Sequence, residues 1–374
     1  MGSPGEVLRL FGKGSRVHWP AFSVSSSPAS GREVPLPSQH ARRCSRRRFL
    51  GGVTLAGTAG LLGLTPKPIV AEAPPETSTL RIAQSPAICF APQYVAADQL
   101  FQAEGFVDVQ YVKRSPLALE TLVSGEADLA SADVGSMIVG IDKGQPLVIL
   151  AGLHVGCYEL FGTDQIRSIR DLAGKQVAIP GLHSPRHLML STMLAYVGVD
   201  PRRDIHWITQ PARESMQLLA EGKIDAFLGF PPEPQELRAR KIGHVLVSMT
   251  VDRPWSQYFC CFVAAHRDFV RKHPVATKRA LRATLKAATV CALEPERAAR
   301  FLVDRGFAPH YDLMVQTLKE LPYLQWREYN AEDTVRFYAL RLHEVGLIKS
   351  SPQKLIAQGT NWRFFNELKK ELKG

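Results

Sequence analysis

The stretch that most constrains the fold is Leu172 to Trp207, where strand, loop and helix signals follow one another closely. A short apolar run, Gln176 to Ile179, is stopped by Pro180-Gly181. Ser184 then stands where a helix N-cap belongs, and Pro185 follows at the first helical position, where a missing N–H costs nothing. The segment therefore predicts a strand, a loop and a helix that begins at Pro185.

The helix should bury one stripe and return the chain to a second strand. Gly198 closes it, Asp200-Pro201 turns the chain, and Ile205 to Ile208 reads as a strand. The apolar positions recur at intervals of three and four: Leu188, Met189, Thr192, Met193, Tyr196 and Val197. A βαβ unit leaves its loop at the carboxyl end of a strand, beside the free N–H groups of a helix start, and this is where we expect a ligand.

The basic charge of the chain belongs mostly to its first residues. The formal net charge is +11, but residues 1–48 carry nine Lys and Arg against two acids, and the part from Pro74 carries 36 against 32. With 374 residues the chain can form more than one core. The balance after Pro74, without a basic and aromatic patch, argues against a nucleic-acid or membrane-surface binder.

Residues 1–73 read as an export signal. Ser45-Arg46-Arg47-Arg48-Phe49-Leu50 resembles the twin-arginine motif, and a Gly-rich apolar run to Leu64 follows it. That run is 16 residues, below the roughly 20 needed to span a bilayer. Ala71-Glu72-Ala73 offers a cleavage site, and an uncleaved anchor or a basic tail is the alternative.

The cysteines form neither a disulfide framework nor a zinc pattern. Cys44 lies in the leader, and an odd number at irregular spacing remains. We expect these side chains to be buried as small apolar groups, with a metal or redox role for Cys260-Cys261 as the alternative: Cys89, Cys157, Cys260, Cys261 and Cys291.

The rest of the mature chain divides into an α/β part and a helical end. Strands are expected at 80–83, 107–112, 146–150 and 244–249, with an extended run at 255–264. Helices are expected at 93–104, 116–124, 137–141, 274–291, 295–305, 311–321, 331–345, 352–358 and 363–370.

One motif occurs twice in this pattern. Leu122 to Leu129 and Leu219 to Ala226 share L-x-x-G-x-x-D followed by apolar residues, 97 positions apart. Each copy reads as a helix that ends at Gly and a strand that begins at Asp, which favours two similar α/β lobes; chance punctuation in an α/β chain is the alternative. Crossings between the lobes are expected near 157–164 and 253–262.

In their order and spacing, several segments resemble the bacterial solute-binding proteins of ABC importers for sulfonates, nitrate and thiamine-pyrimidine precursors. These segments are Ala91-Pro92-Gln93-Tyr94, GEADLASADVGS, DLAGKQVAIPGLHS, GKIDAFLGFPPEP and RDFVRKHPVATKRALRATLKAA, within about Leu80 to Leu368. The resemblance implies an α/β, two-lobed periplasmic-binding-protein fold of type II with a helical C-terminal tail. It also implies lobe 1 at 74–158 plus 259–374, lobe 2 at 159–258, and a monomeric protein that hands a small solute to a membrane permease.

A relative of another class is the fungal thiamine-pyrimidine synthase, an enzyme that shares this fold and consumes pyridoxal phosphate. Its Lys and His would fall at Ala132 and Ser136, and its cysteine-rich run near Tyr258 to Phe262. Without an amine to form the Schiff base and an imidazole beside it, the synthase reaction cannot begin. We therefore expect no catalysis, no cofactor and no metal, with the enzyme as the alternative.

Ligand contacts are expected in the loops at strand ends and at helix starts. Gly135-Ser136 and Ser184 would offer amide and hydroxyl donors to an anion, although plain capping is the alternative. Arg186 is a candidate for a carboxylate or phosphate, and acid at Asp133 and Glu233 argues against a simple inorganic anion. The full expected set is Ser85, Phe90, Ser131, Asp133, Gly135, Ser136, Gly181, His183, Ser184, Arg186, Phe230, Glu233, Trp255 and Tyr258.

Overall fold

The computed structural model describes residues 72–85, 87–114 and 117–373. The twin-arginine motif with Arg46 and Arg47 lies outside these residues, so the export signal stays a prediction. Within the described ranges, none of the helices is both long enough and apolar enough to cross a membrane.

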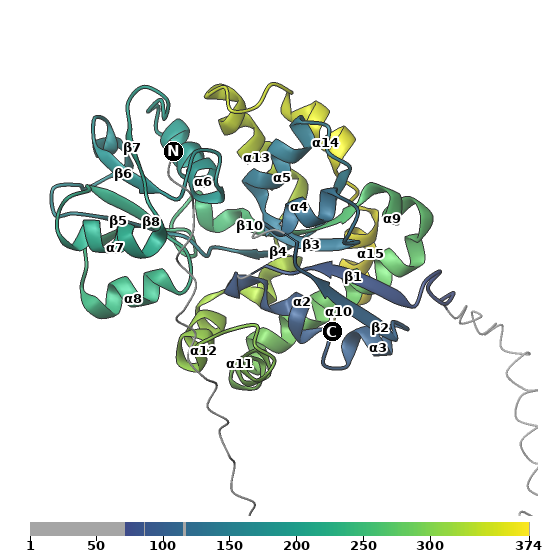
Figure 1. Ribbon diagram of the computed structural model, residues 1–374. Helices are drawn as coiled ribbons and strands as arrows, with labels where there is room; N and C mark the ends of the chain where they lie inside the picture. Colours follow the sequence, from purple (N-terminus) through teal and green to yellow (C-terminus); the bar gives the residue numbers. More distant parts are fainter. Residues whose placement is uncertain (1–71, 86, 115–116, 374) are drawn as a thin grey trace, which may run out of the picture. The chain divides into compact units, whose positions relative to one another are not determined.

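Two five-stranded sheets form the centre of the fold (Figure 1). The first has the order β2-β1-β3-β10-β4, with β1 parallel to β2 and β3, and β10 antiparallel to β3 and β4. Its strands are β1 Thr79–Ala83, β2 Asp108–Val112, β3 Leu129–Asp133, β4 Leu147–Val155 and β10 Phe259–His266.

The second sheet repeats this arrangement in the order β7-β6-β8-β5-β9. β6 is parallel to β7 and β8, and β5 is antiparallel to β8 and β9. Its strands are β5 Glu159–Gly162, β6 Gln176–Ile179, β7 His206–Thr209, β8 Ala226–Gly229 and β9 His244–Ser248.

The repeated sequence motif occupies the same place in both sheets. Gly125 and Gly222 end helices with φ of 77° and 67°, a conformation that glycine adopts at no steric cost. The carboxylate of Asp128 accepts a hydrogen bond of 2.8 Å from the Arg81 amide on β1. That of Asp225 accepts one of 2.8 Å from Gln176 on β6. Each Asp thus fixes its strand to the neighbouring parallel strand.

Helices cover both faces of the first sheet (Figure 1). The helices of the α/β part are η2 Ile88–Phe90, α2 Ala91–Val95, α3 Leu100–Ala103, α4 Ala118–Val123, α5 Val134–Asp142, η3 Ile169–Leu172, α6 Pro185–Tyr196, α7 Ala212–Ala220, α8 Glu233–Arg240 and η4 Trp255–Gln257. The helical C-terminal region comprises α9 Arg267–Lys272, α10 Pro274–Leu293, α11 Pro295–Asp304, α12 Tyr311–Glu320, η5 Tyr323–Arg327, α13 Ala331–Glu344, α14 Pro352–Gly359 and α15 Arg363–Glu371.

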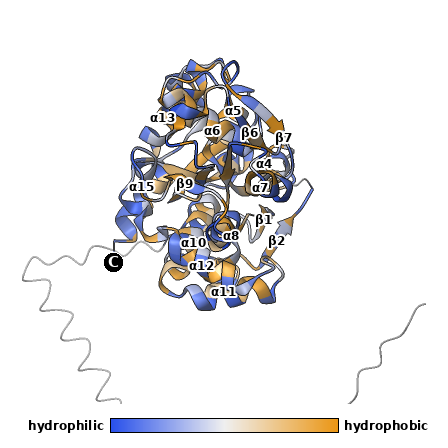
Figure 2. Cartoon of the chain, turned by 90° about the vertical axis from the view of Figure 1, so that its left-hand side faces the viewer, coloured by the Kyte–Doolittle hydropathy of each residue, from blue (hydrophilic) through white to orange (hydrophobic). Residues whose placement is uncertain are grey.

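The helical C-terminal region is confirmed and is part of the packing. α13 contacts both α5 and α6, and α14 contacts α5 and β4. α11 and α12 show hydrophilic and hydrophobic stretches side by side, as amphipathic helices do (Figure 2). β4 and all but the last residue of β10 are buried along their whole length, as expected for strands covered on both faces.

Three local expectations were wrong. The helix expected at 93–104 is interrupted at residues 96–99, between α2 and α3. The extended run expected from Trp255 begins as the 3-10 helix η4 and becomes a strand at Phe259. The first crossing is shorter than expected, because β5 already belongs to the second sheet from Glu159. Contacts group residues 71–374 into one compact unit, so the lobe boundaries stay a prediction.

Candidate ligand-binding site

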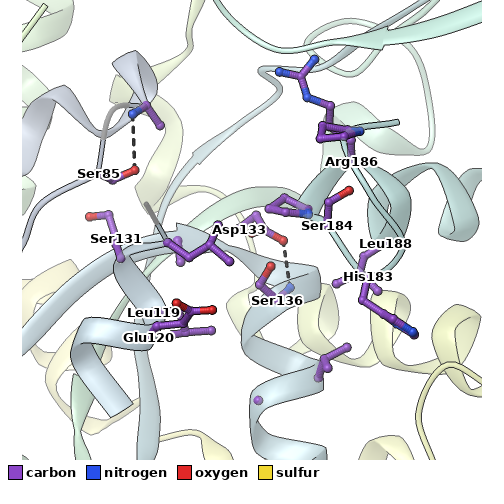
Figure 3. A pocket seen from close by; sticks show the side chains of 18 of the residues that line it. Ser85, Leu119, Glu120, Ser131, Asp133, Ser136, His183, Ser184, Arg186 and Leu188 are labelled. Carbon is purple, nitrogen blue, oxygen red and sulfur yellow. Dashed lines mark hydrogen bonds between the residues drawn. The ribbon is translucent and has the colours of Figure 1, made fainter. Parts of the chain in front are cut away.

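A pocket of about 460 Å³ lies where loops of the two sheets meet (Figure 3). The first sheet contributes the loop after β1, the end of β3 and the first turn of α5; the second contributes the loop after β6, the start of α6 and the residue after β8. These are the carboxyl ends of parallel strands, where α/β sheets bind ligands.

Nine of the expected ligand contacts line this pocket. They are Ser85, Phe90, Ser131, Asp133, Ser136, His183, Ser184, Arg186 and Phe230. Ser136 and Ser184 thus face the same cavity from different sheets. Gly135, Gly181, Glu233, Trp255 and Tyr258 are outside the lining.

Trp255 and Tyr258 pack against α13 of the C-terminal region, and Trp255 also packs against the end of α6. Trp255 is 2% exposed and meets Tyr196 and Phe337 edge-on. The Tyr258 ring stacks on Phe337 with centroids 4.1 Å apart. These contacts give both aromatics a packing role, and a stacking role toward a ligand is unsupported.

The two helix starts that face the pocket are capped by their own side chains. The Asp133 carboxylate accepts a hydrogen bond of 2.8 Å from the Ser136 amide (Figure 3). Ser184 Oγ accepts one of 3.3 Å from the His187 amide, as the Ser-Pro signal predicts. The Ser136 amide proposed as an anion donor is therefore already bonded to a carboxylate.

Asp133 brings acidity to the pocket. Burial raises the pKa of its carboxyl to about 6, and the hydrogen bond from Ser136 opposes that rise. The side chain of Tyr158 lines the pocket too, and burial together with the charge of Asp133 raises its pKa. Near neutral pH this part of the cavity holds a poorly solvated negative charge.

Arg186 and Glu233 neutralise each other. Arg186 Nη1 lies 2.5 Å from Glu233 Oε2, and Nη2 donates to Oε1 at 2.7 Å. Arg186 also donates to the Leu228 carbonyl at 3.1 Å, and Glu233 accepts from the Phe230 amide at 2.9 Å. Figure 3 shows the guanidinium pointing away from Asp133 and Ser131. The pair ties α6 to the end of β8 and to α8.

His183 is held in a left-handed turn before α6, with φ of 62°. Its amide donates to Nδ1 of His187 at 3.2 Å, so His187 is neutral in this arrangement. Burial, then the charge of His183, lowers the pKa of His187 to about 4. Trp207 packs edge-on against His187 at 4.9 Å and completes its surroundings.

The Gln93-Tyr94 pair fixes two polar residues of the first sheet. Tyr94 Oη accepts from the Ser85 amide at 2.8 Å and donates to the Ser85 carbonyl at 2.7 Å. Gln93 accepts from the Ser131 amide at 3.1 Å. The Ser131 hydroxyl is buried and has no hydrogen-bond partner among the described residues, so it is available to a ligand.

Sequence reasoning missed much of the apolar wall. Leu119 and Val123 come from α4, Val139 from α5 and Leu188 from α6. Their spacing is that of ordinary core residues, so no local signal separates them. Lys143 and Gln145, just after α5, also line the pocket, and Tyr158 follows the crossing from β4.

The fold is the α/β periplasmic-binding-protein fold. The periplasmic nitrate-binding protein NrtA from Synechocystis PCC 6803 matches with a TM-score of 0.64 at 17% identity, over 80% of this chain and 90% of that one. The periplasmic aliphatic sulphonate binding protein SsuA from Escherichia coli matches with a TM-score of 0.60 at 18% identity, over 77% and 94%. At these identities the likeness concerns the fold.

The chain belongs to the NMT1-like family, which matches residues 73–303. A bicarbonate-binding protein, CmpA from Synechococcus elongatus, is 32% identical over 112 residues, covering 29% of this chain. The matched segment spans about a quarter of the length of that protein, 24%. The resemblance to ABC solute-binding proteins is therefore confirmed at the level of family and fold.

Proposed function

We propose that this protein is the exported solute-binding component of an ABC importer, that it closes two lobes on one small organic molecule, and that it delivers that molecule to a membrane permease. The observation that carries the proposal is the pocket, because both sheets contribute strand ends and helix starts to it. The proposed lobes are residues 74–158 with 259–374, and residues 159–258. The proposed solution state is a monomer.

The pocket favours a solute with an apolar body and a hydrogen-bond donor. The walls are largely aliphatic, from Leu119, Val123, Val139 and Leu188. The buried Asp133 carboxylate accepts a hydrogen bond from the Ser136 amide. Arg186, the cation at the start of α6, is paired with Glu233, which leaves Lys143, after α5, as the lysine or arginine of the lining that could meet an anion. Of the sulfonate, carboxylate and pyrimidine-like classes, the pyrimidine-like class fits best, because its ring N–H or amino group can donate to Asp133.

The pH dependence of solute affinity tests whether Asp133 binds a hydrogen-bond donor or repels an anion. An N–H donor needs Asp133 ionised, so affinity should rise between about pH 5 and 7.5, across the carboxyl pKa of about 6. An anion such as nitrate, bicarbonate or a sulfonate should bind more weakly over the same range. Calorimetric titrations with aminopyrimidines, aromatic carboxylates, alkanesulfonates and inorganic anions at both pH values distinguish the two.

Asp133→Asn is the matching variant. The amide oxygen can still accept from the Ser136 amide, but the charge is gone, so the pH dependence of affinity should flatten. A folded protein that gives no heat with any of these solutes, at either pH, would overturn the binding proposal. Tight binding of an alkanesulfonate that improves on going from pH 5 to 7.5 would overturn the choice of solute class.

The enzyme alternative is weaker on this structure. Ala132 and Ser136, at the positions where the synthase carries its Lys and His, both line the pocket and supply neither group. Pyridoxal phosphate should therefore give no Schiff-base absorbance with the protein. A stable absorbance that borohydride traps on one lysine would favour the enzyme.

Export is proposed from the leader. Arg46→Lys with Arg47→Lys should keep the protein in the cytoplasm, because twin-arginine signals are read by a receptor. Fractionation of cells that express the full-length chain measures this directly.

A further inference from the structure

Four of the cysteines in the described part of the chain meet in one buried cluster. Cys157 lies between β4 and β5, Cys260 and Cys261 are in β10, and Cys89 is in η2. The Cys261 sulfur is 3.9 Å from those of Cys89 and Cys157, and 3.5 Å from that of Cys260. Residues up to 172 positions apart thus bring their thiols together.

A strand irregularity places the two adjacent cysteines in this cluster. Neighbours on a regular strand point to opposite faces. The register of β10 on β4 shifts on both sides of Cys261, as in a β-bulge, which re-aims side chains and is frequent next to functional sites. The bulge accounts for the presence of both Cys260 and Cys261 sulfurs in one cluster.

We propose that Cys157 and Cys260 form a disulfide in the exported protein, while Cys89 and Cys261 remain thiols. The Cys157 and Cys260 sulfur atoms are 2.7 Å apart, closer than any other pair in the cluster. A zinc ion bound by two thiolates would hold their sulfurs about 3.8 Å apart, because each bond is about 2.3 Å in tetrahedral geometry. The Cys157–Cys260 pair is therefore too close for two thiolates that share one zinc ion. Cys261, in contrast, lies 3.9 Å from both Cys89 and Cys157, a spacing that a metal ion could bridge, so a bound metal is the outcome that the test has to separate from the disulfide.

The bond forms by oxidation, and its electrons need an acceptor. The two S–H bonds break, one S–S bond forms, and the two electrons and two protons pass to a disulfide oxidant, which becomes two thiols. The proposal rests on export, because disulfides persist in oxidising compartments. Cys157 is 4% and Cys260 0% exposed, so the bond forms during folding and is then shielded from reductants.

The disulfide would join the connection between β4 and β5 to the start of β10, the strand that follows the second sheet in the chain. Cys157 precedes the second sheet in the chain and Cys260 follows it, 103 residues later. The whole of β5 to β9 lies in the loop that the bond closes. Closing a loop of this length restricts the unfolded chain and stabilises the fold. Cys261 pairs with Asp133 between β10 and β3, so the same junction borders the pocket.

Peptide mapping of the exported full-length chain tests the pairing. Alkylation in denaturant without reductant should modify Cys89, Cys261 and Cys291 and leave a linked pair of peptides. Cys261→Ser should keep the link and thereby assign it to Cys260. Cys291→Ser is the control, because Cys291 is equally buried but belongs to no sulfur contact with the cluster.

Stability supplies a second measurement. Reduction in denaturant followed by refolding should lower the unfolding midpoint of the wild type and of Cys291→Ser, but not of Cys157→Ser or Cys260→Ser. Alkylation of both Cys157 and Cys260 without reductant overturns the proposal, and so does a stoichiometric soft metal bound with both of these thiols reduced. Refolding the full-length chain with glutathione disulfide separates a failure of export from a failure of pairing. If this refolded chain also lacks the Cys157–Cys260 link, the disulfide proposal is overturned. Solute titration of the same samples reports independently on the binding function.

Discussion

Asp133 is the residue that most directly links the pocket to the folding stability of the protein. Its pKa is raised from 3.8 to about 6 by burial, so the folded state binds the proton more tightly than the unfolded chain. The stability that this group contributes is complete below about pH 4 and is lost as the pH rises to about 6. Above that range the protein carries a buried charge that a solute can use.

Asp133→Asn should therefore stabilise the solute-free protein at pH 7.5 by up to about 3 kcal/mol, since each pKa unit corresponds to about 1.4 kcal/mol. Near pH 4 the variant and the wild type should have the same free energy of unfolding. Urea denaturation at the two pH values measures the difference. If Asp133→Asn changed the free energy of unfolding equally at pH 4 and pH 7.5, burial of the Asp133 charge would not be the cause of the change.

Arg186 and Glu233 form the other decisive contact at this scale. Their side chains are 13% and 17% exposed, so Glu233→Gln would leave a poorly solvated guanidinium without its partner. We expect a loss of about 2 to 4 kcal/mol in the free energy of unfolding. Glu236→Gln, which breaks the exposed pair with Arg240 on the same helix, should change it by less than about 0.5 kcal/mol. Equal losses of stability in Glu233→Gln and Glu236→Gln would contradict the conclusion that Arg186 and Glu233 form a buried ion pair.

Among the elements, α6 and α14 share the same start. Ser184-Pro185 and Ser351-Pro352 both place a serine N-cap before a proline, and both hydroxyls accept an amide hydrogen bond of 3.3 Å. Ser184→Ala and Ser351→Ala should each cost about 1 kcal/mol of stability. Ser184 lines the pocket, so only its variant should also weaken solute binding. Calorimetry on both variants checks this, and unchanged affinity in Ser184→Ala would limit Ser184 to capping.

The start of α5 approaches α6 closely at Gly135. A Cβ there would lie 3.1 Å from the Cβ of Leu188 and 3.3 Å from Asp133 Oδ1. Gly135→Ala should push the two helices apart and thereby distort the pocket, so we expect solute affinity to fall about fivefold or more. Overpacking itself costs roughly 1 to 3 kcal/mol of stability, and because alanine is the better helix former the loss should lie at the lower end of that range. Unchanged affinity would show that α6 shifts to accommodate the added methyl group without disturbing the pocket.

At the scale of the whole molecule, binding should close the lobes and stabilise the fold. A ligand that binds only the native state adds about 2.7 kcal/mol at a hundred times its Kd. Hinge closure should also reduce the radius of gyration. Thermal unfolding and small-angle scattering with and without solute measure both effects. A solute that stabilises the protein without compacting it would argue for a preformed pocket.

The sequence by itself determined those features of the structure that depend on residues close together in the chain. The β6–loop–α6–β7 unit, the Ser184 cap, the repeated Gly and Asp positions and most C-terminal helices follow from local turn, capping and periodicity rules. These signals also predicted the loops that carry nine of the pocket residues, because strand ends and helix starts are fixed by the same rules.

Only the tertiary structure decided which side chains meet. The contact of Arg186 with Glu233 spans 47 positions, and the contact between the Cys157 and Cys260 sulfur atoms spans 103. Both contacts depend on strand order and register, which no local pattern encodes. Trp255 packs on α13 and not in the pocket for the same reason. The chemical types present in the pocket came from the sequence, whereas their partners, burial and charge state came from contacts between distant segments.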